Sequence, residues 1–156
     1  MVRIVLKLEL DCSPDAAWDA IRSPRVFRAV SAPLIRFVSL EPGGFPQQWT
    51  PGGHRVKAKV LGFVPMGTQL ISASETHSAD GVRVMRDNGP PLTGALAVIR
   101  SWQHSMAVSA LPDGRTLFRD ELVFSAGIAN VPVWISMWAF WQWRAFRIRA
   151  LAPSFR

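Results

Sequence analysis

The fold is decided by residues 102–124, which read WQHSMAVSALPDGRTLFRDELVF. The segment Pro112-Asp113-Gly114 suits a three-residue turn, because proline fits the second position of a type I turn and glycine tolerates the left-handed position that follows. Such a turn joins two antiparallel strands and pairs Ala110 with Thr116. We therefore expect strands at 95–110 and 115–125, with a register that the turn sets.

One face of this hairpin is predicted to point into the core. The register pairs Met106 with Asp120 and His104 with Leu122, and side chains alternate along each strand. The more apolar face consists of Trp102, His104, Met106, Val108, Thr116, Phe118, Asp120, Leu122 and Phe124. On it, His104 and Asp120 occupy diagonal positions within reach of each other. A shift of the register by one residue would turn both outward.

The pair of His104 and Asp120 has two interpretations. It can be a polar handle in an apolar cavity, which orients a ligand's hydroxyl or carbonyl group or moves protons, because burial perturbs the pKa of both groups. It can also be a hydrogen-bonded pair that ties two strands together. We favour the structural pair over catalysis, and contact with a ligand stays open.

The earlier part of the chain reads as a strand, two short helices and further strands. Residues 2–10 alternate between apolar and mostly charged residues, which is typical of a half-buried strand. The sequence Ser13-Pro14-Asp15 marks a helix start, and Ser23-Pro24 repeats it for a second helix at about 25–30. The loop 41–53 is long enough to be a lid or an ordinary surface loop. Further strands are expected at 34–40, 54–63, 68–77 and 82–87.

The last element is predicted to be a helix of about 20 residues, from near Pro132 to Ala152. One stripe, about 100° wide, is apolar. It consists of Trp134, Met137, Trp138, Trp141, Ala145, Ile148 and Ala152. An antiparallel sheet needs its apolar face covered, and no other helix here is long enough. We expect part of the stripe to fill the core and part to line a cavity.

The opposite side of that helix is also rich in apolar residues. It combines Ile135, Phe140, Trp143 and Phe146 with Arg144, Arg147 and Arg149. We reject a transmembrane segment, because polar residues and proline interrupt the run and the tryptophans are spread along it. A homodimer contact is the favoured use of this surface, and weak contact with an anionic membrane is the alternative.

Short motifs occur in a characteristic order along the whole chain. They are Asp11-Cys12-Ser13-Pro14-Asp15-Ala16-Ala17-Trp18, Trp49-Thr50-Pro51-Gly52, Leu61-Gly62-Phe63-Val64-Pro65-Met66-Gly67, Trp102-Gln103-His104, Gly114-Arg115-Thr116 and Asp120-Glu121. This order resembles the START-like superfamily, also called SRPBCC or polyketide cyclase/dehydrase-like. The resemblance implies an α+β helix-grip fold, in which a seven-stranded curved antiparallel sheet, two short helices and one long C-terminal helix enclose a deep cavity. Members bind sterols, lipids, polyketides, quinones or hormones, and some catalyse cyclisation or dehydration, so the fold does not fix the function.

Composition predicts a single globular domain over residues 1–156. Hydrophobic residues make up 49% and charged residues 19% of the chain. The single cysteine, Cys12, excludes an internal disulfide and a cysteine-based zinc cluster. The first residues lack an uninterrupted apolar run, so we expect no signal peptide and a cytoplasmic location. The three histidines lack carboxylates at metal spacing, so we expect no metal and no cofactor.

The net charge of +7 comes from residues spread along the chain. The stripe Arg55, Lys57 and Lys59 has no aromatic residues on its face, so we expect a solvated surface and no nucleic-acid partner.

Three functions remain open. The first is a carrier or sensor that binds a hydrophobic small molecule (lipid-, polyketide- or quinone-like) without chemistry. The second is a cyclase or dehydratase in which His104 and Asp120 are the candidate catalytic residues. The third is a dimer- or membrane-contact protein with a vestigial cavity. The expected ligand-binding residues are Trp102, His104, Met106, Phe118, Asp120, Leu122, Phe124, Trp134, Met137, Trp138 and Trp141.

Overall fold

The computed structural model describes residues 1–156 as one sheet and three α-helices. The strands are β1 (Val2–Leu10), β2 (Ile35–Ser39), β3 (Gly53–Val60), β4 (Val64–His77), β5 (Arg83–Asp87), β6 (Ser101–Ala110) and β7 (Thr116–Ser125). The helices are α1 (Pro14–Ile21), α2 (Pro24–Ser31) and α3 (Asn130–Leu151), with 3₁₀ turns η1 (Gly94–Val98), η2 (Gly127–Ala129) and η3 (Ala152–Ser154).

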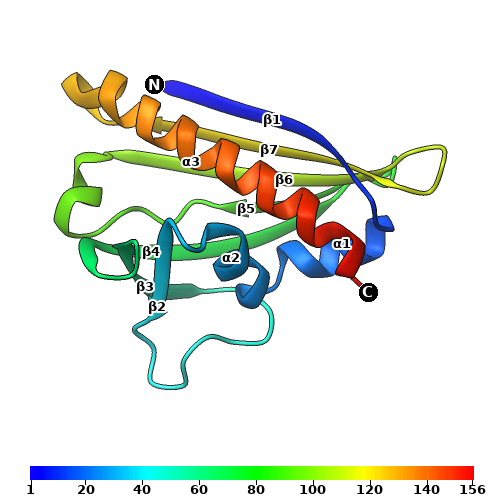
Figure 1. The fold of residues 1–156 in the computed structure, drawn as a ribbon, viewed down its shortest axis with the longest axis horizontal. Coiled ribbons are helices and arrows are strands. Elements are labelled where there is room, and N and C mark those ends of the chain that lie inside the picture. The colour runs from blue at the N-terminus through cyan, green and yellow to red at the C-terminus, as the bar shows by residue number, and fades with distance from the viewer.

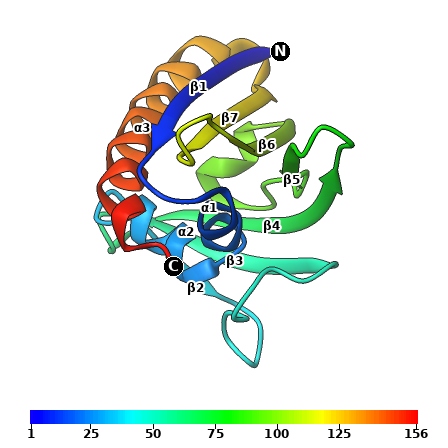
Figure 2. The same ribbon diagram turned by 90° about the vertical axis from the view of Figure 1, so that its right-hand side faces the viewer.

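The seven strands form an antiparallel sheet in the order β1-β7-β6-β5-β4-β3-β2. Every neighbouring pair is consecutive in the chain except β1 and β7, which bring the first and last strands together (Figure 1). Figure 2 shows the sheet curling around the side on which α3 and the two short helices lie. The architecture is the α+β helix-grip arrangement expected from the sequence.

The register of the last hairpin confirms the prediction. Ala110 pairs with Thr116, Met106 with Asp120, and the remaining pairs follow without a bulge. In the turn, the backbone N–H of Gly114 donates to the carbonyl of Leu111 over 3.0 Å. Gly114 has a φ of 82°, which lies in the left-handed region that glycine tolerates.

The strand predicted at 95–110 begins later in the structure, at Ser101. Residues 94–98 form the 3₁₀ turn η1 instead of the start of a strand. Leu96 and Ile99 are buried three residues apart, which is a helical spacing, and the residues between them are exposed.

Ser13 caps α1 as expected, since its hydroxyl accepts a hydrogen bond from the N–H of Ala16 over 3.2 Å.

The long loop 41–53 is anchored in the core by an aromatic side chain. Trp49 is only 5% exposed. Its ring meets Phe27 of α2 edge to face, with ring centres 5.6 Å apart, and the backbone N–H of Trp49 donates to the carbonyl of Arg22. The loop therefore covers the space between α2 and the sheet.

The segment that follows β5 lies directly against β4. The N–H of Leu70 donates to the carbonyl of Pro90 over 3.0 Å, and the N–H of Gly89 donates to Oδ1 of Asp87 over 3.0 Å. A Cβ atom on Gly89 would lie 1.9 Å from the carbonyl oxygen of Leu70. The close approach of the two backbones requires glycine at this position.

We predict that Gly89→Ala lowers the free energy of unfolding by about 1–3 kcal/mol, because the methyl group forces the two segments apart. Urea denaturation measures the loss. Gly43→Ala is the matched control, since a Cβ atom there meets nothing within 4 Å. Equal stability of the two variants would contradict the close approach.

Candidate functional site

Two adjoining cavities of about 50 Å³ and about 40 Å³ lie between the sheet and the helices. The larger is lined by Phe27, Ile35, Phe37, Ala58, Met66, Gln69, Ile71, Asp87, Pro91, Leu96, Ile99, Trp102, His104, Met137, Phe140, Trp141 and Arg144. The smaller is lined by Ile21, Val26, Phe27, Val30, Trp49, Ile71, Met85, Asp87, His104, Met106, Arg144 and Ile148. Five residues line both cavities: Phe27, Ile71, Asp87, His104 and Arg144.

Both cavities are small for a ligand site. An engineered protein cavity that binds benzene measures about 150 Å³. The single deep cavity implied by the family resemblance is therefore not found in this conformation. Buried side chains of α3, namely Phe140, Trp141 and Arg144, line the larger cavity.

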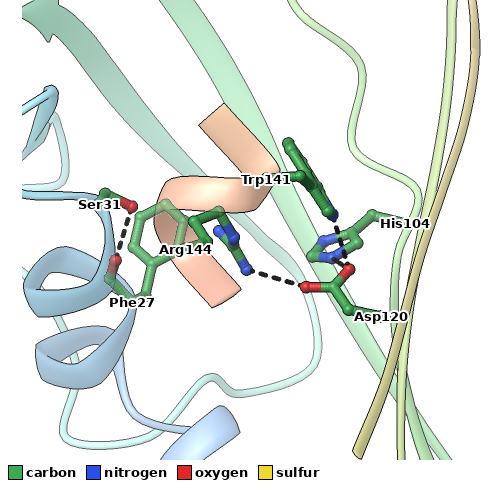
Figure 3. A network of polar contacts seen from close by, with 6 residues as sticks. All are labelled: Phe27, Ser31, His104, Asp120, Trp141 and Arg144. Carbon is green, nitrogen blue, oxygen red and sulfur yellow. Dashed lines mark hydrogen bonds and ion pairs between the residues drawn. The ribbon is translucent and has the colours of Figure 1, made fainter. Parts of the chain in front are cut away.

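A buried carboxylate behind the cavity wall holds α3 to the sheet (Figure 3). Asp120 of β7 is 2% exposed. Its Oδ1 accepts a hydrogen bond from Nε2 of His104 over 2.8 Å and another from Nε1 of Trp141 over 2.9 Å. Its Oδ2 lies 3.5 Å from Nη2 of Arg144. The predicted pair of His104 and Asp120 thus exists, with two further partners from α3.

The surroundings of Asp120 favour its charged form. Burial by itself raises the pKa of this carboxyl, but the charge and hydrogen bond of His104, the charge of Arg144 and the indole N–H of Trp141 together lower the pKa below its usual value. An ionised carboxylate only accepts hydrogen bonds, so Nε2 of His104 carries the shared proton.

Arg144 of α3 is a buried cation on the wall of both cavities. Its residue exposure is 8%, and its guanidinium carbon lies 4.9 Å from the ring centre of Trp141. Its Nε–H is buried and has no hydrogen-bond partner. Such unmet donors are rare inside proteins. The sequence-based assignment of Arg144 to the outer side of α3, together with Phe140, is wrong, since both side chains are buried.

Asp87 is a second buried carboxyl, and it lies directly on the cavity wall. It stands opposite His104 in the pairing of β5 with β6 and is 5% exposed. Its Oδ1 accepts from the N–H groups of Ser72 and Gly89 over 2.7 and 3.0 Å. Burial raises the pKa of Asp87, against the lowering effect of these hydrogen bonds and of His104.

The residues expected to bind a ligand fall into two groups. Those on the cavity walls are Trp102, His104, Met106, Met137 and Trp141. Those away from both cavities are Phe118, Asp120, Leu122, Phe124, Trp134 and Trp138. The reason is that α3 packs on β1 and its side chains reach Asp120 of β7, while the cavity walls on the sheet come from β2 to β6.

The two outlying tryptophans show how α3 is rotated relative to the prediction. Trp138 is 46% exposed and stacks on Trp134. Nε1 of Trp134 donates to the backbone carbonyl of Arg3 in β1. Phe140 and Arg144 take the inward positions that the sequence analysis gave to these tryptophans.

Asp87 and Arg144 were missed, although the sequence carries a signal for each. Alternation along β5 places Asp87 on the same face as the buried Met85. Arg144 follows Met137 and Trp141 at helical spacing. In both cases we expected the side chain to lie in solvent because it is charged. No cluster of three or more His, Cys, Asp or Glu residues that could hold a metal is present.

Solved structures share the fold of this chain at low sequence identity. The chain superimposes on a protein from Arthrobacter aurescens with a TM-score of 0.71 at 12% identity, over 97% of this chain and 86% of that one. It superimposes on a norcoclaurine synthase point mutant from Thalictrum flavum, in complex with a transition-state analogue, with a TM-score of 0.65 at 11% identity, over 98% and 94%. The chain has the START-like fold.

A third similar structure is a protein from Chromobacterium violaceum, which superimposes with a TM-score of 0.61 at 11% identity over 96% of both chains. No family model matches the sequence, and neither does any curated protein. The identities are low, so these likenesses concern the START-like fold and leave the chemistry to the residues of this chain.

We predict that Asp120→Asn lowers the free energy of unfolding by about 3 kcal/mol, because the guanidinium of Arg144 then stays charged, buried and without a counter-ion. Glu121→Gln is the matched control, since Glu121 pairs with Arg3 at the surface and its loss should cost less than about 1 kcal/mol. Urea denaturation compares the two. Similar small losses would contradict the structural role of Asp120.

We predict that Asp87→Asn removes part of the pH dependence of stability. The folded protein holds the proton of Asp87 more tightly than the unfolded chain does, so wild-type stability falls as pH rises above about 4. An asparagine keeps an oxygen acceptor for Ser72 and Gly89 but does not ionise. The advantage of the variant over wild type should therefore grow with pH in urea denaturation. Parallel pH curves would overturn the prediction.

Proposed function

We propose that the protein binds a hydrophobic small molecule, lipid-, polyketide- or quinone-like, between the sheet and α3, as a carrier or sensor without chemistry. The observation that carries this proposal is the pair of adjoining cavities in the core, whose walls are mostly apolar. A well-packed core of this size leaves few voids larger than a water molecule.

The shared wall suggests how a larger guest enters. Phe27 and Ile71 line both cavities, and Phe27 is only half-buried on the short helix α2. Met66 and Met137 add flexible walls to the larger cavity. A rotation of the Phe27 ring would join the two spaces.

An enzyme of cyclase or dehydratase type is the second candidate. The hydrogen bond between His104 and Asp120 favours it, because the ring of His104 lines both cavities while Asp120 fixes that ring from behind. In that case His104 would meet the substrate and Asp120 would be a positioning residue. One structural neighbour, norcoclaurine synthase, is an enzyme.

A contact protein is the third candidate. Apolar side chains are exposed along α3 and just before it, at Ile128, Val131, Ile135, Trp138 and Phe146. They support a homodimer contact first and a membrane-surface contact second. No α-helix of the structure has the length and apolar character needed to cross a membrane. We retain the cytoplasmic location as part of the proposal.

We predict that Ile71→Phe weakens binding of the neutral dye N-phenylnaphthylamine at least about tenfold, because the larger ring fills both cavities. Dye fluorescence measures the affinity, and thermal unfolding checks that the variant is folded. Val38→Phe, on the more exposed β2, is the control and should bind as wild type does. Unchanged dye binding by Ile71→Phe would move the site to the surface of α3 and favour the contact protein.

A further inference from the structure

Two residues that line the larger cavity each carry a buried N–H without a hydrogen-bond partner. Nε of Arg144 is one and Nε1 of Trp102 is the other. The indole N–H of Trp102 lies toward Asp87 and contributes to lowering its pKa, yet makes no hydrogen bond of normal geometry. A buried donor that leaves water without a partner costs about 1–3 kcal/mol. Two such donors, one on β6 and one on α3, indicate an acceptor that comes with the guest.

The charges around the cavity favour a neutral acceptor over an anion. The guanidinium of Arg144 already faces the carboxylate of Asp120 at 3.5 Å. A carboxylate on the ligand would add a negative charge near both Asp120 and Asp87 in a poorly solvated space. A carbonyl oxygen brings two lone pairs and no net charge.

The walls select a flat ligand. Phe27, Trp102, Phe140 and Trp141 line the larger cavity, and Trp102 meets Trp141 edge to face with ring centres 6.1 Å apart. Aromatic faces and edges provide favourable contacts for another ring.

We propose that the guest is an aromatic or alicyclic molecule with a neutral carbonyl group, whose oxygen accepts hydrogen bonds from Nε of Arg144 and Nε1 of Trp102. This inference rests on the proposed binding function and specifies its ligand class. Burial raises the pKa of Asp87, which lines the same cavity.

The test compares three molecules of nearly the same size and shape: acetophenone, cumene and benzoate. NMR titration of the protein measures each affinity from the resonances of cavity residues. Acetophenone should bind about tenfold more tightly than cumene, and benzoate should bind more weakly than acetophenone.

Two variants locate the effect. Arg144→Lys keeps a positive charge near Asp120 but places a methylene group where Nε–H stood. Trp102→Phe keeps an aromatic ring and removes the indole N–H. Each should reduce the preference for acetophenone over cumene several-fold. Arg149→Met, an exposed change on the same helix, is the control and should leave the preference intact.

The outcomes separate this inference from the proposed function. If wild type binds acetophenone and cumene equally, or binds benzoate most tightly, the proposed carbonyl site is wrong. The proposed binding of a hydrophobic small molecule is then still supported. An unchanged preference in both Arg144→Lys and Trp102→Phe overturns the assignment of the donors. Binding of none of the three molecules counts against the cavities as a ligand site and removes both proposals.

Discussion

The carboxylate of Asp120 is the interaction on which the arrangement of this protein depends. It is ionised in the core, and its donors come from β6 and from two residues of α3, one turn apart. A buried charge of this kind is tolerated only when its hydrogen bonds are met, so the donors cannot be moved independently. Trp141 and Arg144 reach the same carboxylate, and this sets which side of α3 faces the sheet. The position of the guanidinium at the cavities is a consequence of that rotation.

Two carboxyl groups on one face of the sheet have opposite electrostatic surroundings. Asp120 has three side-chain donors, one of which is the cation Arg144, and its pKa is lowered. Asp87 accepts from two backbone N–H groups, but burial is the largest effect on it and its pKa is raised. His104 stands between them in the register and hydrogen-bonds to Asp120 alone. The pKa values of two carboxyls on one face of the sheet are therefore shifted in opposite directions.

Much of the fold could be predicted from local rules, but the rotation of α3 could not. The Pro112-Asp113-Gly114 turn set the hairpin register and with it the meeting of His104 and Asp120. The helix α3 has large apolar residues on all sides, so periodicity gave no reason to prefer Phe140 over Trp138 as an inward residue. Arg144 was assigned to water because a lone arginine usually lies there, and only the position of Asp120 in three dimensions shows why it does not. The size of the cavities depends on how these side chains pack, which no sequence pattern describes.

The pairing of β1 with β7 has a consequence for biosynthesis. Residues 2–10 are synthesised before their partner strand, residues 116–125, which follows more than a hundred positions later. Until then, Ile4, Leu6, Leu8 and Leu10 have no sheet edge to join. The nascent chain thus carries an unpaired apolar strand while the intervening hundred residues are made, a period in which chaperones or neighbouring chains compete for it.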